Sequence, residues 1–98
     1  MTHDIRLTVP LVERLVGLAE ECSELSQAAL KYRRALTGIN PTPMDAETCY
    51  DKLMEEIADV MLYLETLYLN KKQIEQIQHD KRERWLGRLE AQQCGNQR

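Results

Sequence analysis

Residues 55–69, EEIADVMLYLETLYL, decide the fold of this chain. Over residues 57–69 apolar side chains fall on nearly every side of a helix, which is typical of a helix that other helices enclose. Glu56 and Asp59 stand at the start of this stretch, and an acid in an enclosed helix must meet a positive group or lose its charge. The stretch therefore predicts both a central helix and a site at its acids.

A long amphipathic helix is predicted before this stretch. Its apolar residues recur at alternating spacings of four and three, which is the pattern of one helical stripe. Pro10 suits the first turn and Gly38 suits a left-handed C-terminal cap, so we expect the helix to end near Thr37. The stripe consists of Leu11, Leu15, Leu18, Cys22, Leu25, Ala29, Tyr32 and Leu36.

The central helix is expected to start near Pro43, with Thr42 as its N-cap, and to end near Leu69. Asn70 is expected to cap a third helix through Leu89, which then frays into QQCGNQR. The sequence shows no β alternation, so we predict an all-α helical bundle of about three to four helices. Two other helices cannot enclose the central one, and we therefore expect a homo-oligomer, a dimer or a tetramer, to complete the bundle.

Length and composition set the class of protein. A chain of 98 residues predicts a single domain over 1–98, with its core over about 10–90 and a disordered tail over 91–98. Its 43% hydrophobic and 30% charged residues and its net charge of -3 disfavour polymeric nucleic acid and anionic membranes as partners. The start MTHDIRLTVP lacks an apolar signal core, and no apolar run is long enough to cross a membrane, so we expect a cytoplasmic protein.

Two pairs of acids stand on the predicted helices. Glu21 and Glu24 share a face of the first helix, and Glu56 and Asp59 share a face of the central helix, because residues three apart are neighbours on a helix. If the pairs face each other, the basic residues on these faces are too few to balance four carboxylates. Hard oxygen donors without histidine favour Mg²⁺ or Mn²⁺, and the ExxH motif of dinuclear iron sites is absent. A solvated helix face is the alternative interpretation, and it is stronger for the first pair than for Asp59.

Two residues beside these acids are further candidates. Glu20 lies about 100° around the helix from Glu21, so it would either orient water beside the metal ligands or be solvated. Lys31 lies on the acid-bearing face of the first helix, where its ammonium group could contact a phosphate.

A basic segment of the third helix offers a second set of contacts. Lys81, Arg84 and Arg88 fall on one helix face and could grip phosphates, although a solvated basic face explains them equally well. Trp85 could stack on a base, but aromatic residues at helical spacing are more often core or subunit contacts.

The order of the acids resembles a known family. Residues 20–24, EECSE, followed by residues 56–59, EIAD, resemble the EExxE and ExxD motifs of the MazG-like nucleotide pyrophosphohydrolases, the all-α NTP pyrophosphatases. The later segment IQHDKRERWLGRLE is similar to the basic third segment of that family, and the resemblance covers about residues 10–90. The segment between the two motif helices, TGINPTPMDAETCYDK, is longer than in many relatives, and the third segment matches only loosely.

The resemblance implies hydrolysis of a nucleoside triphosphate between its α and β phosphates, with Mg²⁺, to give a monophosphate and pyrophosphate. By position, Glu21, Glu24, Glu56 and Asp59 would be the metal ligands, and with Glu20 they form the expected catalytic set. Two other functions stay open at this point. One is a noncatalytic helical module for oligomerisation or partner binding, and the other is a nucleotide-sensing relative with little turnover.

Overall fold

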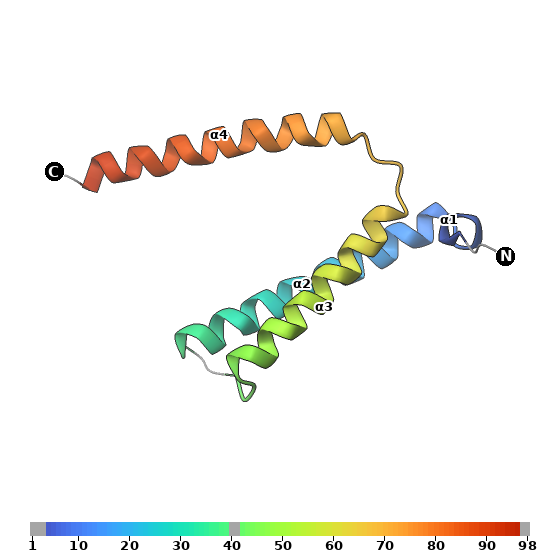
Figure 1. The fold of residues 1–98 in the computed structure, drawn as a ribbon, viewed down its shortest axis with the longest axis horizontal. Helices are drawn as coiled ribbons and strands as arrows, with labels where there is room; N and C mark the ends of the chain where they lie inside the picture. Colours follow the sequence, from blue (N-terminus) through green and yellow to red (C-terminus); the bar gives the residue numbers. More distant parts are fainter. Residues whose placement is uncertain (1–3, 40–41, 97–98) are drawn as a thin grey trace. The chain divides into compact units, whose positions relative to one another are not determined.

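The structure is a computed structural model that describes residues 4–39 and 42–96, and all the regular structure in this part of the chain is helical. The prediction of an all-α helical fold is therefore confirmed. The chain divides into two units, Met1–Tyr68 with the first three helices and Leu69–Arg98 with the fourth, and that the two form one domain stays a prediction. The helices are α1 (Ile5–Thr8), α2 (Leu11–Thr37), α3 (Ala46–Glu65) and α4 (Lys71–Asn96) (Figure 1).

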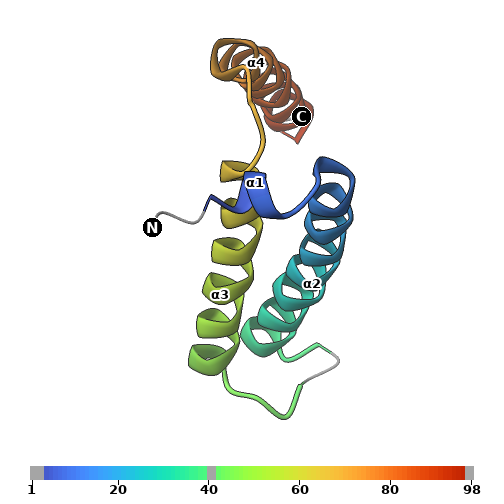
Figure 2. The same ribbon diagram turned by 90° about the vertical axis from the view of Figure 1, so that its right-hand side faces the viewer.

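In the first unit, α2 and α3 run antiparallel, side by side (Figure 2). The end of α2 is the predicted one, since Gly38 adopts φ 71° and its N–H donates to the Arg34 carbonyl at 2.9 Å. Glycine takes this left-handed conformation without the steric cost that a Cβ brings. Gly38 thus ends α2 and starts the connection to α3.

The predicted start of α3 at Thr42 and Pro43 is wrong. The helix begins at Ala46, and its N-cap is Asp45, whose carboxylate accepts a hydrogen bond from the Thr48 N–H at 2.7 Å. This hydrogen bond lowers the pKa of Asp45. The carboxylate satisfies a free amide and lies at the positive end of the helix dipole, so it replaces the Thr42 hydroxyl as the cap.

The predicted end of α3 at Leu69 also differs from the structure, in which the helix ends at Glu65. The Thr66 hydroxyl donates to the Tyr63 carbonyl at 2.6 Å, and the Thr66 carbonyl accepts from the guanidinium of Arg14. Arg14 is buried, and its Nε also donates to the Val9 carbonyl at 3.0 Å. A cation on α2 therefore holds the carboxyl end of α3, where the helix dipole favours positive charge.

The short helix α1 has no signal in the apolar spacing. Asp4 caps it by accepting from the Arg6 N–H at 2.9 Å, and the two side chains form an ion pair at 3.1 Å. These local bonds form one helical turn just before α2 begins.

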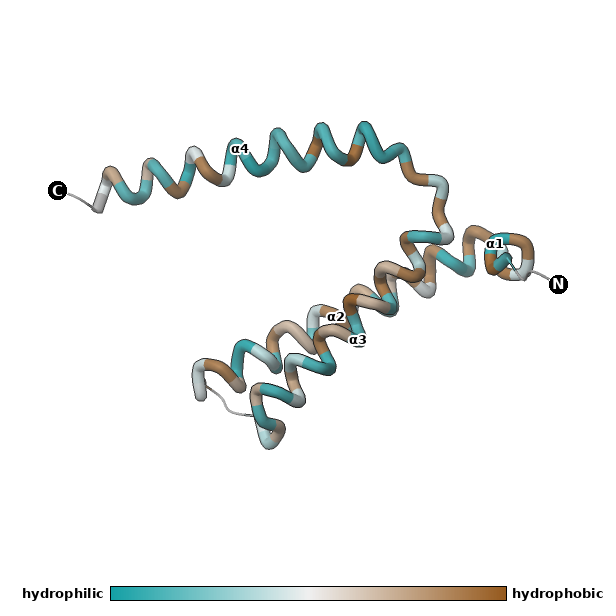
Figure 3. The backbone as a smooth tube through the Cα atoms, in the orientation of Figure 1, coloured by the Kyte–Doolittle hydropathy of each residue, from teal (hydrophilic) through white to brown (hydrophobic). Residues whose placement is uncertain are grey.

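In the second unit, α4 starts where predicted, because the Asn70 side chain accepts from the Gln73 N–H at 3.0 Å. The expected fraying after Leu89 is wrong, since α4 continues to Asn96, and residues 97–98 lie outside the described residues. Alanine and glutamine at 91–93 are good helix formers, which explains the longer helix. Most of α4 is hydrophilic (Figure 3).

Residues 57–69 are not enclosed within the first unit. Met61 is 56% exposed and Leu62 is 48% exposed, and every apolar side chain between residues 57 and 69 is half-buried or exposed. The oligomer that was expected to cover this helix stays a prediction. In the part of the chain that the structure describes, every helix is too short or too polar to cross a membrane.

Candidate metal centre

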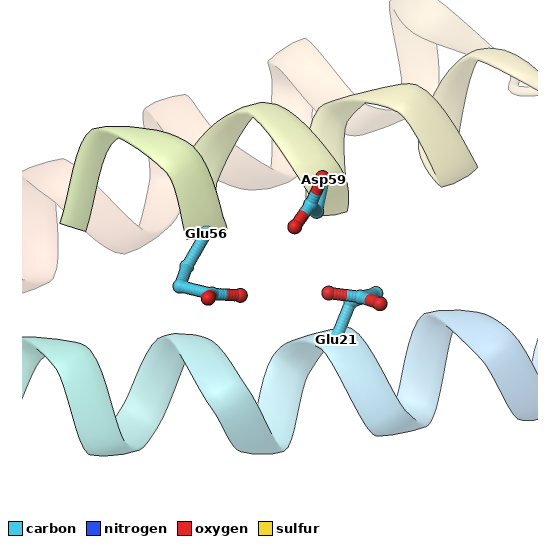
Figure 4. Close-up of side chains that lie close together, drawn as sticks. All are labelled: Glu21, Glu56 and Asp59. Carbon is cyan, nitrogen blue, oxygen red and sulfur yellow. The ribbon is translucent and has the colours of Figure 1, made fainter. Parts of the chain in front are cut away.

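Three carboxylates from two helices point toward one another (Figure 4). Glu21 of α2 and Glu56 and Asp59 of α3 each place one oxygen so that all three oxygens lie within 4.8 Å of one another. Glu21 and Glu56 are half-buried, and Asp59 is exposed. The structure thus brings together three of the four acids expected to bind metal.

The close approach of the two helices at this point depends on a small residue. Gly17 is buried one turn before Glu21, and a methyl group added to it would overlap the ring of Tyr63, one turn after Asp59. A larger side chain at this position would force the Tyr63 ring to move or the two helices to separate. Gly17 therefore lets the Tyr63 ring pack against α2 one turn from the point where Glu21 faces Asp59.

The electrostatics of the cluster are unfavourable for three negative charges. Burial raises the pKa of Glu21, and the negative charges of Asp59 and Glu56, together with a hydrogen bond to Asp59, raise it further. The side-chain ion pairs among the described residues are Arg6–Asp4 and Lys52–Glu55, so none of them neutralises this cluster. A proton or a cation is the remaining way to relieve the repulsion.

The cluster suits a small divalent cation. Mg²⁺ bonds to oxygen at about 2.0–2.1 Å in an octahedron, so opposite ligand atoms lie about 4.2 Å apart. The three oxygens lie within 4.8 Å, and a small side-chain rotation would bring them onto one ion. All are hard carboxylate donors, which favours Mg²⁺ or Mn²⁺ over softer metals.

Glu24 is separate from the three-oxygen cluster but lies beside it. It lines a cavity of about 160 Å³ that also borders Glu56, so the cavity adjoins the acids. Two basic side chains, Lys31 and Lys52, line the same cavity. The other lining residues are Gln27, Ala28, Met44 and Cys49, of which Ala28 and Cys49 are buried.

Cys49 and Lys52 could have been found by their spacing from the candidate Glu56, but were not themselves among the candidates. Cys49, Lys52 and Glu56 lie on one face of α3, because each stands three or four residues after the one before. Met44 precedes the helix and has no such signal. The cavity is therefore built from one face of α2 and one face of α3, which the sequence indicates, and from one loop residue, which it does not.

The remaining candidates fall into two groups. Glu20 is exposed on α2 and does not belong to the cluster, whereas Lys31 is half-buried and lines the cavity. The candidates on α4 are all exposed and border one shallow hollow of that helix, which belongs to the second unit. They are Lys81, Arg84, Trp85 and Arg88.

Comparisons with protein-family models, with curated proteins and with solved structures gave no match to this chain. A function must therefore be argued from the geometry of the acids and the cavity, together with the resemblance of the segments EECSE and EIAD.

Proposed function

We propose that this chain is a Mg²⁺-dependent nucleoside triphosphate pyrophosphohydrolase, which cleaves between the α and β phosphates. The observation that carries the proposal is the cluster of Glu21, Glu56 and Asp59. One of these residues comes from the EECSE segment and two come from the EIAD segment, so the two motifs of the MazG-like resemblance meet in space.

Glu21, Glu56 and Asp59 would hold Mg²⁺, or Mn²⁺, and Glu24, which lines the adjoining cavity, stays the proposed fourth ligand. When bound, the metal would neutralise charge on the phosphates and lower the pKa of a water molecule. Glu20, which is exposed beside Glu21, is proposed to orient that water. The protein's own part is to bring three oxygens to one place and to hold them there through the contact of Gly17 with α3.

Positive side chains beside the acids would bind the phosphates. Lys31 and Lys52 line the cavity that shares Glu56 with the cluster, so a phosphate chain held at the acids would meet ammonium groups next to them. In the second unit, Lys81, Arg84 and Arg88 stay proposed phosphate contacts and Trp85 a proposed surface for a base. We place the reaction in the cytoplasm, where nucleoside triphosphates are made and used.

Pyrophosphate release tests this proposal. Purified protein is incubated with canonical, deoxy and modified nucleoside triphosphates, with and without Mg²⁺, and the products are separated. Asp59→Asn should abolish the Mg²⁺-dependent release of pyrophosphate, whereas Asp51→Asn, the same change at an exposed position on α3, should leave it unchanged. Circular dichroism of both variants confirms that the helices are retained.

Three outcomes would contradict the proposal. Orthophosphate and a nucleoside diphosphate as products would overturn the bond assignment. Thermal stabilisation by nucleotides without turnover would indicate a sensor. Neither turnover nor stabilisation with any nucleotide would indicate a noncatalytic helical module.

A further inference from the structure

A second cavity of the first unit, of about 130 Å³, lies where α1 meets the helix pair. Its walls are mostly apolar and come from α1, from the residue after it and from α3. Ile5 is 43% exposed and Leu62 is 48% exposed, so these walls reach the surface of the unit. The residues that line the cavity are Ile5, Val9, Arg14, Leu62, Tyr63 and Thr66.

Of these lining residues, Arg14 alone is charged, and its side chain is buried with only 6% exposed. Burying a cation is strongly unfavourable unless an anion lies beside it. The ion pairs in the described part of the chain are Arg6–Asp4 and Lys52–Glu55, so Arg14 has no ion pair there. The cavity therefore contains a buried cation without a carboxylate partner.

The carboxylate of Asp4 does not take this place. It accepts hydrogen bonds from the Arg6 side chain at 3.1 and 3.2 Å and from the Arg6 N–H at 2.9 Å. These bonds to Arg6 are the main causes that lower the pKa of Asp4, and the charge of Arg14 contributes least. Asp4 is therefore bound to α1 and leaves Arg14 without a counter-charge.

The carbonyl groups bonded to Arg14 balance only part of its charge. Its Nε donates to the Val9 carbonyl at 3.0 Å, and one Nη donates to the Thr66 carbonyl at the carboxyl end of α3. A helix end carries roughly half an elementary charge, so a net positive charge remains at Arg14. The first turn of α2, which begins at Leu11, adds the positive end of a second helix dipole. The charges at this end of the unit thus favour a bound anion.

Arg14 also has a donor to spare for that anion. A guanidinium carries N–H donors on each of its nitrogens, and the bonds to Val9 and Thr66 use Nε and one Nη. Among the described residues, the other Nη has no hydrogen-bond partner. An anion in the cavity would accept a charge-assisted hydrogen bond from it, which is stronger than a bond between neutral groups.

The walls of the cavity indicate the class of anion. A phosphate needs several donors, whereas a monocarboxylate can keep one oxygen in water while the other accepts from Arg14. An engineered cavity of about 150 Å³ in another protein binds benzene, so a cavity of about 130 Å³ suits a short apolar chain. Butanoate has as many heavy atoms as benzene and combines such a chain with one carboxylate.

We propose that this cavity binds a short aliphatic monocarboxylate, with its carboxylate on Arg14 and its chain among Ile5, Val9 and Leu62. The ligand is a free acid, because the carboxyl terminus of a peptide would bring further polar amide groups to apolar walls. The proposal does not depend on the hydrolysis proposed above, since the lining residues belong neither to the acid cluster nor to the cavity beside it.

Titration of the full chain with sodium butanoate at neutral pH, followed by amide NMR spectra, tests the site. Butanoate should bind saturably and should shift the amide signals of residues 5–9 and 62–66 most. Butanamide, its uncharged counterpart of the same shape, should bind more weakly by about tenfold or more, because it brings no negative charge to Arg14. Inorganic phosphate and acetylglycylvaline, which ends in a peptide carboxylate, should also bind more weakly than butanoate.

Two matched variants test where the aliphatic chain lies. Leu62→Trp fills the cavity with a larger side chain, so it should weaken butanoate binding by about tenfold or more. Leu30→Trp makes the same change at a leucine on α2 that is 58% exposed and outside the cavity, and it should bind butanoate as the wild type does. Circular dichroism confirms that both variants keep their helices, and Ile5→Trp replaces Leu62→Trp if that variant is unfolded.

Several results would overturn the proposal. These are the absence of saturable binding, equal affinity for butanoate and butanamide, and equal affinity of the two tryptophan variants for butanoate. Tighter binding of phosphate would refute the ligand class, and tighter binding of acetylglycylvaline would identify a peptide terminus in place of a free acid. Amide shifts centred on Lys31 or Arg84 would place the acid at another cation.

Discussion

Gly17 of α2 lies against the ring of Tyr63 of α3, and this contact stands one helical turn from Glu21 and one turn from Asp59. The absence of a side chain at residue 17 lets the two helices approach at the point where their carboxylates meet. Helix packing and the candidate metal centre therefore depend on the same contact.

Gly17→Ala should destabilise the protein by about 1–3 kcal/mol, because the added methyl overlaps a ring in a packed contact. The matched control is Gly87→Ala on α4, where an added Cβ has no neighbour within 4 Å. It should stabilise its helix by roughly 0.5–1 kcal/mol, since alanine favours a helix interior over glycine. Urea unfolding measures both variants, and a neutral Gly17→Ala would show that the Tyr63 ring or the helices can shift without loss of stability.

Arg14→Met should cost about 2 kcal/mol of stability, because the buried guanidinium donates to the carbonyls of both Val9 and Thr66. Methionine keeps much of the side-chain volume and removes the donors. Arg33→Met, at an exposed position on α2, is the control and should change stability by less than about 0.5 kcal/mol. Equal effects of the two substitutions on the unfolding free energy would show that Arg14 does not hold α3.

Asp45→Ala should cost about 1 kcal/mol at neutral pH, because it removes the N-cap of α3. The hydrogen bond from Thr48 lowers the pKa of Asp45, so its contribution is present above the ordinary aspartate pKa and is lost as pH falls through the lowered one. The unfolding free energies of wild type and Asp45→Ala should therefore converge in strong acid. Thr42→Ala, at the cap expected from the sequence, should have little effect, and a larger effect there than at Asp45 would reverse this assignment.

The sequence was sufficient for α2, α3 and α4, but not for the short α1 or for all of the helix ends. Apolar spacing and Gly38 located α2, whereas the start of α3 depended on which of two polar residues would cap it. Arg14 could not be assigned to the interior, because its partners are backbone carbonyls that only the fold brings near. An unpaired arginine in a helix gives no signal of such a role.

The candidate site could be predicted only in part, again because some of its contacts depend on how the helices pack together. Spacing within each helix placed Glu21 with Glu24 and Glu56 with Asp59 on shared faces. The register between the helices, set in part by Gly17 and Tyr63, decided that Glu21 meets the α3 acids while Glu24 lines the cavity. Spacing within one helix carries no information about that register.

The stability of the metal-free protein should depend on pH through Glu21. Its raised pKa means that the folded state binds this proton more tightly than the unfolded chain does. The contribution of this proton to the unfolding free energy is complete below the ordinary glutamate pKa of 4.5. It is lost as pH rises from there through the raised pKa. Glu21→Gln cannot lose this proton, so its stability relative to wild type should rise over the same window and then level off. Thermal unfolding of both proteins in EDTA measures the difference, and a constant difference across the window would contradict the assignment.

Mg²⁺ should stabilise the wild-type protein above this pH window, because the three carboxylates repel one another less when they share a cation. At a Mg²⁺ concentration of about 100 times the dissociation constant, the gain in unfolding free energy should be about 2.7 kcal/mol, and EDTA should remove it. Asp59→Asn should lose most of this gain, while Asp51→Asn should keep it. As pH falls, Glu21 takes up its proton and the metal should bind less tightly. Because the pKa of Glu21 is raised, the Mg²⁺-dependent gain in unfolding free energy should begin to shrink at a higher pH than it would with an ordinary glutamate. Equal stabilisation of both variants by Mg²⁺ would place the ion elsewhere and remove the basis of the proposed hydrolysis.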